Sequence, residues 1–403
     1  MVDLEFDIND EETEAELKVD LNKFDQAVIW GTDWTTETIA RQLEKGNIDL
    51  NPSFQRRDAW SEHEKSKLIE SLMLGLPVPP IILAESREKK NSYIVIDGKQ
   101  RLLSIRRFYS GVSDGQIEEK KLLEKDVFKQ LKLKGLEILK IFNGMTYSQA
   151  EQVNADYINN IDNQAIRTIV IKNWPDEAFL YTVFLRLNTG SKKLSSQELR
   201  QALKPGRFLT FLDEETAESD IIKIMLNNKT PDPRMKDIEL ALRFYALKFF
   251  VEKYKGNLKE FLDFTCEELN RNWENNEEII RETFVELENA IAFLINLFGS
   301  RAAFSRYTDG KCNERFNRSI FEVFTYYFSM KSVREAVEKE PNKFKDQFIL
   351  LNKDPEFNYS VSDTTKDINR LVMRFKKIHD ILSEMTKEKL PSLVLVKGKI
   401  KVI

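Results

Sequence analysis

The sequence predicts an α+β protein: a small mixed β-sheet with helices in the N-terminal part, followed by a mainly α-helical C-terminal part. Three short runs rich in Ile and Val, at residues 80–84, 93–96 and 165–172, are typical of buried strands and lie before residue 175. From residue 195 to about 388, almost every segment instead carries apolar residues at helical spacing. The 14 glycines and 11 prolines are too few for an all-β protein rich in turns.

The N-terminal elements are expected in a defined order. Ser61 and Glu64 have the spacing of a capping box, which marks the start of a helix. We expect, along the chain, helices at 35–45 and 62–76, strands at 80–84 and 93–96, a helix at 100–109, a lysine-rich amphipathic and partly inserted helix within 115–140, a strand at 165–172 and a helix at 176–187.

The C-terminal part is expected to hold helices at 236–253, 277–297 and 314–330 and a terminal strand within 393–402. The change of pattern falls between residues 190 and 210, where Pro205-Gly206 interrupts a helix. We therefore divide the chain into an acidic, flexible tail at 1–20, an α+β domain at 21–193 and a helical domain at 194–403.

The acidic tail dominates the charge balance. Residues 1–20 hold nine acidic residues and one lysine, so the remaining 383 residues carry +4 within a chain of net charge −4. Such a tail is either a solvated, partly disordered end or a segment that covers a basic groove until a ligand displaces it.

Composition excludes several classes of protein. No apolar run approaches the roughly 20 residues that span a bilayer, and the acidic start lacks the regions of a signal peptide. Two distant cysteines, Cys266 and Cys312, argue against a disulfide framework and favour a reducing cytoplasm. The two histidines, His63 and His379, are too few for an HNH nuclease module or a His-rich metal site, and a Ser-His-Asp hydrolase is hard to build.

The most informative segment is a strand that ends in a tight turn and leads at once into a helix: Ile94-Val95-Ile96-Asp97-Gly98-Lys99-Gln100-Arg101. A helix N-terminus presents backbone N–H groups and partial positive charge, and so attracts anions. Gly98 lets the backbone approach a phosphate, while Lys99 and Arg101 add cationic donors. The alternative is that Asp97 and Gln100, at N-cap and N3 spacing, form a capping box.

Two further segments are candidates for contact with phosphates. The cationic segment from Asn51 to Trp60 contains Gln55, Arg56 and Arg57 between aromatic residues, and its alternative is a surface loop anchored by Phe54 and Trp60. Between residues 186 and 207 there are six basic residues and one acid, including Lys192, Lys193 and Arg200. Such a patch fits DNA through counterion release, or is a solvated helix face.

Three blocks, in the right order, resemble the N-terminal domain family of GmrSD-type restriction endonucleases. They are Pro52-Ser53-Phe54-Gln55-Arg56 with Trp60, Leu68-Ile69-Glu70-Ser71-Leu72 with Gly75-Leu76-Pro77-Val78-Pro79, and Val95-Ile96-Asp97-Gly98-Lys99-Gln100-Arg101-Leu102. Arg186-Leu187-Asn188-Thr189-Gly190 and Leu194-Ser195-Ser196-Gln197-Glu198-Leu199-Arg200 are similar to the family's later pattern. The resemblance covers most of residues 30–330 and is weakest beyond 230.

The resemblance implies a ParB/sulfiredoxin-like fold in which an Asp-Gly-Gln-Gln-Arg motif binds and hydrolyses nucleotides, in bacterial restriction and antiphage systems. It implies an NTP as ligand, Mg²⁺ near Asp97, DNA as partner and a separate nuclease or defence-operon protein. The residues implied are Asp97, Gln100 and Arg101 for catalysis, Gln55, Arg56, Gly98, Lys99, Arg101 and Asn188 for the nucleotide, and Arg57, Lys192, Lys193 and Arg200 for nucleic acid.

Lys99 replaces the usual Gln, which puts hydrolysis in question. The chain is thus either an NTPase or a non-catalytic DNA-binding or nucleotide-sensing module, with direct DNA nicking as a third reading.

Overall fold

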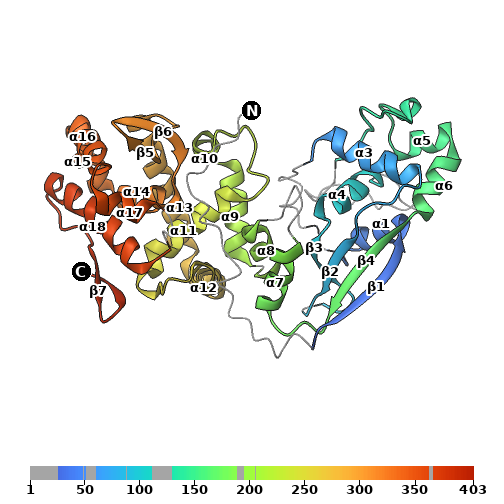
Figure 1. Cartoon of the computed structure of the whole chain (residues 1–403), viewed down its shortest axis with the longest axis horizontal. Helices are drawn as coiled ribbons and strands as arrows, with labels where there is room; N and C mark the ends of the chain where they lie inside the picture. Colours follow the sequence, from blue (N-terminus) through green and yellow to red (C-terminus); the bar gives the residue numbers. More distant parts are fainter. Residues whose placement is uncertain are drawn as a thin grey trace. The chain divides into compact units, whose positions relative to one another are not determined.

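The computed structural model describes residues 26–48, 50, 60–87, 89–110, 129–187, 195–204, 206–362 and 366–403. By internal contacts the described chain divides into two compact units, and the division falls between Leu203 and Lys204. We refer to them as the N-terminal unit and the C-terminal unit (Figure 1). In the described parts, every helix is too short or too polar to cross a bilayer.

The N-terminal unit contains a four-stranded mixed sheet with strand order β1-β4-β2-β3. Its strands are β1 (Val28–Thr35), β2 (Ile81–Glu85), β3 (Tyr93–Asp97) and β4 (Ala165–Lys172). β4 pairs antiparallel with β1 and parallel with β2, and β3 pairs antiparallel with β2. β2 is buried on both faces, whereas the first half of β4 alternates between exposed and buried residues. β1 was not predicted, since this edge strand is largely exposed and shows no alternation of burial.

Helices cover this sheet: α1 (Thr36–Glu44), α3 (Glu62–Met73), α4 (Lys99–Phe108), η4 (Lys140–Phe142), α5 (Tyr147–Val153), α6 (Ala155–Asn163), α7 (Glu177–Leu187) and α8 (Ser196–Leu203). The capping box of Ser61 and Glu64 forms as predicted at the start of α3. Phe184 of α7 and Leu199 of α8 join Ile82 and Ile96 in one buried cluster. This packing brings α8 next to β3, although about a hundred residues separate them.

The half-buried carboxylate of Asp162 ties three helices of this unit together. Asp162 of α6 accepts hydrogen bonds from the hydroxyls of Tyr109, at 2.6 Å, and Tyr147, at 2.8 Å. Burial, and then these hydrogen bonds to Asp162, raise the pKa of both tyrosines well above the ordinary value. Both hydroxyls therefore remain neutral donors, and the end of α4 is fixed against α5 and α6.

The C-terminal unit is mainly helical, with two small hairpins. Its elements are α9 (Arg207–Glu218), α10 (Asp220–Met225), α11 (Lys236–Phe250), η5 (Val251–Lys253), α12 (Leu258–Arg271), α13 (Trp273–Phe298), β5 (Ser305–Thr308), β6 (Lys311–Phe316), α14 (Arg318–Phe328), α15 (Lys331–Lys339), α16 (Pro341–Leu351), α17 (Pro355–Val361), α18 (Ile368–Met385), β7 (Leu393–Val396) and β8 (Lys399–Val402). Every residue of α14 is buried, so this helix is the centre of the unit. The predicted α+β class is thereby confirmed.

Several predicted elements need correction. The helix expected within 115–140 is wrong for the described residues 129–139, where Leu131 and Leu133 are buried alternately with exposed lysines and no helix forms. Residues 111–128 and the acidic tail lie outside the described residues. The helix expected from residue 314 begins at Arg318, because β6 occupies Lys311–Phe316.

The chain also ends and divides differently from the prediction. The single terminal strand is a hairpin, because Lys397 and Gly398 adopt φ of 51° and 72° and reverse the chain as a tight turn requires. The predicted boundary between residues 193 and 194 falls outside the described residues. The two units divide ten residues later because α8 packs on β3.

Candidate functional site

The turn between β3 and α4 has the geometry that the sequence predicts. β3 ends at Asp97, Gly98 adopts a left-handed conformation with φ of 99°, and α4 starts at Lys99. A Cβ atom at Gly98 would lie 3.2 Å from both Ile81 Cγ1 and Arg101 Nη2, so only glycine fits without strain. The absence of a side chain at this position lets the Arg101 guanidinium lie across the turn.

Asp97 and Arg101 form an ion pair at this turn. Arg101 Nη2 lies 2.8 Å from Asp97 Oδ2 and donates a second hydrogen bond to the Pro80 carbonyl at 2.9 Å. The Arg101 side chain is 14% exposed and the Asp97 side chain 43% exposed. The alternative capping box of Asp97 and Gln100 is wrong, because Gly98 is the N-cap and no side chain caps it. The Asp97 carboxylate serves Arg101 instead.

Two polar atoms of the motif are buried without a hydrogen bond. Gln100 Oε1 and Arg101 Nε have no partner among the residues that the structure describes. A buried polar atom without a partner costs about 1–3 kcal/mol, so proteins satisfy nearly all of them. Both atoms belong to consecutive residues at the start of α4, beside a partly exposed carboxylate. A ligand that fills this place would remove the cost.

Lys99 does not have the position that a phosphate-binding lysine needs. Its side chain is 3% exposed, and Nζ lies 2.5 Å from Oε1 of the equally buried Glu198. Oε2 of Glu198 accepts the backbone N–H of Ser195 at 2.7 Å, and the Ser195 hydroxyl accepts the N–H of Glu198 at 3.1 Å. The prediction that Lys99 holds a nucleotide phosphate is therefore corrected: this lysine joins the start of α4 to the start of α8.

Arg200 also needs correction. Its side chain is fully buried, and Nη1 donates to Gln197 Oε1 at 2.8 Å. A guanidinium without contact to solvent cannot meet DNA phosphates or release counterions, so the prediction that Arg200 contacts nucleic acid is wrong. The remaining predicted positions lie outside the described residues: Gln55, Arg56, Arg57, Asn188, Lys192 and Lys193.

Two residues that matter here were not singled out for a role by the sequence. Glu198 appeared only as a member of the later family pattern, and Pro80 only at the start of a predicted strand. The basic residue at position 99 was the available signal for a buried acid, but the separation of 99 positions between Lys99 and Glu198 concealed the partner.

A metal ion at this turn would be coordinated mostly by substrate phosphates and water, and by few protein side chains. No group of three or more Asp, Glu, His or Cys side chains within the described chain could hold a metal ion. Mg²⁺ is commonly bound by one or two carboxylates together with substrate phosphates and water. Asp97, with its partly exposed carboxylate, could serve as such a ligand beside a nucleotide.

A hollow of about 360 Å³ lies at the other end of β2. Asp97 pairs with Ile82 near the start of β2, whereas this hollow surrounds Glu85, the last residue of β2. Arg87 covers the Trp174 ring at 3.8 Å and donates to the Trp174 and Pro175 carbonyls. Its guanidinium thus joins the segments that follow β2 and β4, and it is already occupied by these contacts. The Asp97–Arg101 turn is therefore the better site for an anion.

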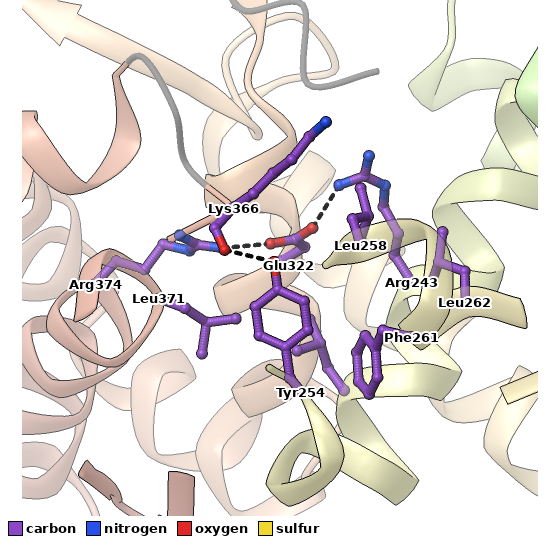
Figure 2. A pocket seen from close by; sticks show the side chains of 10 residues that line it. Arg243, Tyr254, Leu258, Phe261, Leu262, Glu322, Lys366, Leu371 and Arg374 are labelled. Atoms are coloured by element: carbon purple, nitrogen blue, oxygen red, sulfur yellow. Dashed lines mark hydrogen bonds and ion pairs between the residues drawn. The ribbon is translucent and has the colours of Figure 1, made fainter. Parts of the chain in front are cut away.

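The C-terminal unit contains a small pocket beside a buried ion cluster (Figure 2). Glu322 of α14 lies between Arg243 of α11, at 2.8 Å, and Arg374 of α18, at 2.7 Å. The Tyr254 hydroxyl closes one side by donating to the Lys366 carbonyl at 2.6 Å. The cavity of about 20 Å³ holds about one water molecule. This cluster therefore joins three helices and offers no room for a nucleotide.

Comparison with protein families adds to this geometry. Residues 38–203 match the family described as GmrSD restriction endonuclease, N-terminal domain. The matched range contains the Asp97–Arg101 pair and its neighbour Glu198. No match was found among curated proteins or among solved structures. Residues 38–203, which build the Asp97–Arg101 site, are thus similar to the N-terminal domain of GmrSD restriction endonucleases.

Proposed function

We propose that this chain binds a nucleotide at the turn between β3 and α4 and hydrolyses it, as one component of a bacterial restriction or antiphage system. The observation that carries the proposal is the pair of buried atoms, Gln100 Oε1 and Arg101 Nε, that have no partner within the described residues. A phosphate oxygen would accept from Arg101 Nε. A ribose hydroxyl or the attacking water would donate to Gln100 Oε1.

The Asp97–Arg101 ion pair suits an exchange of partners. A partly exposed pair contributes about 1 kcal/mol or less, so opening it costs little. A nucleotide with its Mg²⁺ brings a phosphate for Arg101 and a cation for Asp97, so both charges remain compensated. The buried Lys99–Glu198 pair cannot exchange in this way, because each ion would be left unpaired in a medium of low polarity.

The residues of the turn then have separate roles. Gly98 allows the phosphates to approach the N-terminus of α4, whose backbone N–H groups and dipole favour anions. Arg101 stabilises the negative charge that develops on the phosphates during phosphoryl transfer, and Asp97 orients the metal ion or the attacking water. Gln55 and Arg56 are proposed as the facing loop, and Asn188 as a further nucleotide contact, by the family resemblance alone.

The second candidate function is a nucleotide-sensing or DNA-binding module that works with a separate nuclease and performs no hydrolysis. It is favoured by the observation that both basic residues of the motif already have acidic partners, Arg101 with Asp97 and Lys99 with Glu198. With only His63 and His379, these 403 residues do not contain the imidazoles of an HNH module.

Two measurements on the purified full chain separate these functions: calorimetric titration with ATP, GTP, CTP and UTP, and phosphate release with Mg²⁺ or Mn²⁺. Binding with phosphate release that disappears in Asp97→Ala supports hydrolysis. Tight binding without phosphate release supports the sensing module. Failure of every nucleotide to bind would contradict both.

A further inference from the structure

The last hairpin of the C-terminal unit concentrates lysine. Residues 386–403 contain five lysines and a single glutamate. In the β7–β8 register, Val394 pairs with Lys401 and Val396 pairs with Lys399. Because side chains two residues apart in a strand share a face, Lys399 and Lys401 project on the same side, about 6.6–6.8 Å apart along the strand.

The hairpin presents these charges to solvent. Lys397 lies in the tight turn, so it extends the row of lysines to the tip of the hairpin. Lys397, Lys399 and Lys401 are all exposed. Figure 1 shows the hairpin, labelled β7, projecting from the helices of the C-terminal unit.

Glu252 anchors the hairpin to a distant segment that is also basic. Its Oε1 accepts the backbone N–H of Val402 at 2.9 Å, and its Oε2 lies 3.0 Å from Lys401 Nζ. This contact joins β8 to η5 and the turn after α11, where Lys253 and Lys255 are exposed. The two segments thus form one basic surface, which we call the lysine surface: Lys253, Lys255, Lys397, Lys399 and Lys401.

A hollow with aromatic walls adjoins the lysine surface. It has a volume of about 220 Å³ and is lined by Lys253, Lys255, Asn257, Glu260, Phe261 and Phe264. Lys253 and Lys255 at its rim link this depression to the lysine surface.

Most of the lysine surface lacks acidic partners, unlike many other lysines of the unit. Lys343, Lys376 and Lys377 each lie within about 3 Å of a carboxylate. Over the described chain, Lys253, Lys255, Lys397 and Lys399 form no ion pair, and only Lys401 does so, with Glu252. These lysines outnumber the neighbouring acids Glu252 and Glu260, so a polyanion that binds there gains electrostatic free energy.

We propose that the lysine surface binds the phosphate backbone of duplex DNA. Each strand of DNA carries one phosphate per about 3.4 Å of helix axis, so a row of lysines spaced by about 6.8 Å has phosphates within reach along its whole length. A two-stranded ribbon also has the width that the major groove accepts. The inference goes beyond the nucleotide site and does not depend on it, because it assigns where the C-terminal unit meets DNA.

A protein partner is the competing occupant, since Val396 and Ile403 are also exposed on the hairpin. Covering four unpaired ammonium groups with protein would cost several kcal/mol for each ion that finds no acid. DNA phosphates compensate the same groups without that cost, which is why DNA is favoured.

The test is the salt dependence of DNA binding by the full chain without nucleotide. Fluorescence anisotropy with a labelled duplex of about 25 base pairs, between about 50 and 200 mM NaCl, gives the slope of log affinity against log salt. The triple variant Lys255→Ala/Lys397→Ala/Lys399→Ala removes three phosphate contacts, so we expect a slope shallower by about 2.7. At 0.1 M salt, the DNA affinity should fall by up to about eightfold for each lysine removed.

Matched variants control for charge and folding. Lys331→Ala/Lys339→Ala/Lys345→Ala removes the same charge from α15 and α16, which Figure 1 shows well away from the hairpin, and should keep the wild-type slope. Arginine at positions 255, 397 and 399 should restore the slope, because guanidinium also neutralises phosphates. Circular dichroism and thermal midpoints verify folding.

Two results would overturn the proposal: an unchanged slope in the alanine triple variant, or no binding of duplex DNA by the wild type at the lowest salt. The second result would leave a protein as the occupant. The Arg101→Ala variant should bind DNA like the wild type, so a failed nucleotide site and a failed lysine surface give different outcomes.

Discussion

Lys99 Nζ and Glu198 Oε1 lie 2.5 Å apart inside the N-terminal unit, with both side chains almost completely buried. The pair connects the first residue of α4 with the first turn of α8. Because Lys99 points into the protein at Glu198, it does not contact a ligand at the turn. Lys99 thus determines how α4 is held, and the side chains at the turn itself are those of Asp97, Gln100 and Arg101.

The first prediction concerns this buried pair. Lys99→Ala leaves the Glu198 carboxylate buried without its cation, which should lower the free energy of unfolding by about 3–5 kcal/mol. Lys99→Gln should cost much less, because its amide can still donate to Glu198, and nucleotide affinity should stay at the wild-type level. Urea unfolding followed by circular dichroism measures the first effect, and calorimetric titration the second. An unchanged unfolding midpoint for Lys99→Ala would contradict the assignment.

The second prediction separates binding from turnover at the turn. Arg101→Ala should abolish nucleotide binding, because its guanidinium carries one of the two unpartnered atoms and the positive charge beside Asp97. Asp97→Asn should abolish turnover, and it should strengthen metal-free nucleotide binding because Arg101 loses its competing carboxylate. Titrations with and without Mg²⁺, together with phosphate release, measure both. Equal nucleotide affinity of wild type and Arg101→Ala would refute the site.

The third prediction concerns Gly98, whose φ of 99° is strained for any residue with a Cβ atom. Gly98→Ala should destabilise the unit by roughly 1–2 kcal/mol from backbone strain, and more if Ile81 cannot move away from the added methyl group. It should also weaken nucleotide binding, since the methyl group crowds Arg101. Gly46 is also left-handed but has open space around it, so Gly46→Ala should show the backbone cost alone. Equal unfolding midpoints for the two variants would argue against close packing at Gly98.

The fourth prediction concerns the ion cluster of the C-terminal unit. Glu322→Ala removes the carboxylate shared by Arg243 and Arg374 and should lower the unfolding free energy by about 3–5 kcal/mol. The matched control is Glu335→Ala, which breaks the exposed Lys331–Glu335 pair and should cost less than about 1 kcal/mol. Chemical unfolding monitored by Trp273 fluorescence would compare the two. Similar losses of unfolding free energy in both variants would show that the buried cluster stabilises the unit no more than an exposed ion pair does.

The fifth prediction is a pH dependence of the C-terminal hairpin. The hydrogen bond from the Val402 N–H, and then the Lys401 ammonium, hold the pKa of Glu252 below its ordinary value. A lowered pKa in the folded state means that the contact stabilises the hairpin above the ordinary pKa of about 4.3, and that this contribution is lost as pH falls through the folded pKa. Amide-exchange protection of β7–β8 should be constant from neutral pH to about 5 and fall below that.

Two comparisons check that this loss belongs to Glu252. Glu252→Gln should reduce protection of the hairpin at neutral pH and remove its dependence on pH in the acid range. Amides of the buried helix α14 should keep their protection over the same range, because no part of that helix rests on Glu252. A hairpin whose protection is independent of pH in the wild type would contradict the anchoring role.

Local signals were sufficient for the elements that carry the candidate site. The Ser61–Glu64 capping box, the strand that ends at Asp97 and the helix after Gly98 each depend on residues within a few positions of one another. The terminal hairpin was half predicted: its apolar and basic alternation indicates a strand, but the reversal at Lys397-Gly398 was missed because a Lys-Gly pair is a weaker turn signal than Asn-Gly.

What the sequence by itself determined is therefore the class of the fold and the strand–turn–helix at Asp97-Gly98, since backbone propensity, capping and periodicity act over short stretches of chain. Only the tertiary structure decided which cations are available. Lys99 and Arg200 are basic in sequence yet buried against Glu198 and Gln197, whereas Lys397 and Lys399 remain in solvent without an acid. A side chain's charge is set by its own chemistry, but its burial is set by tertiary packing, and the partner of Lys99 comes from a segment 99 positions further along the chain.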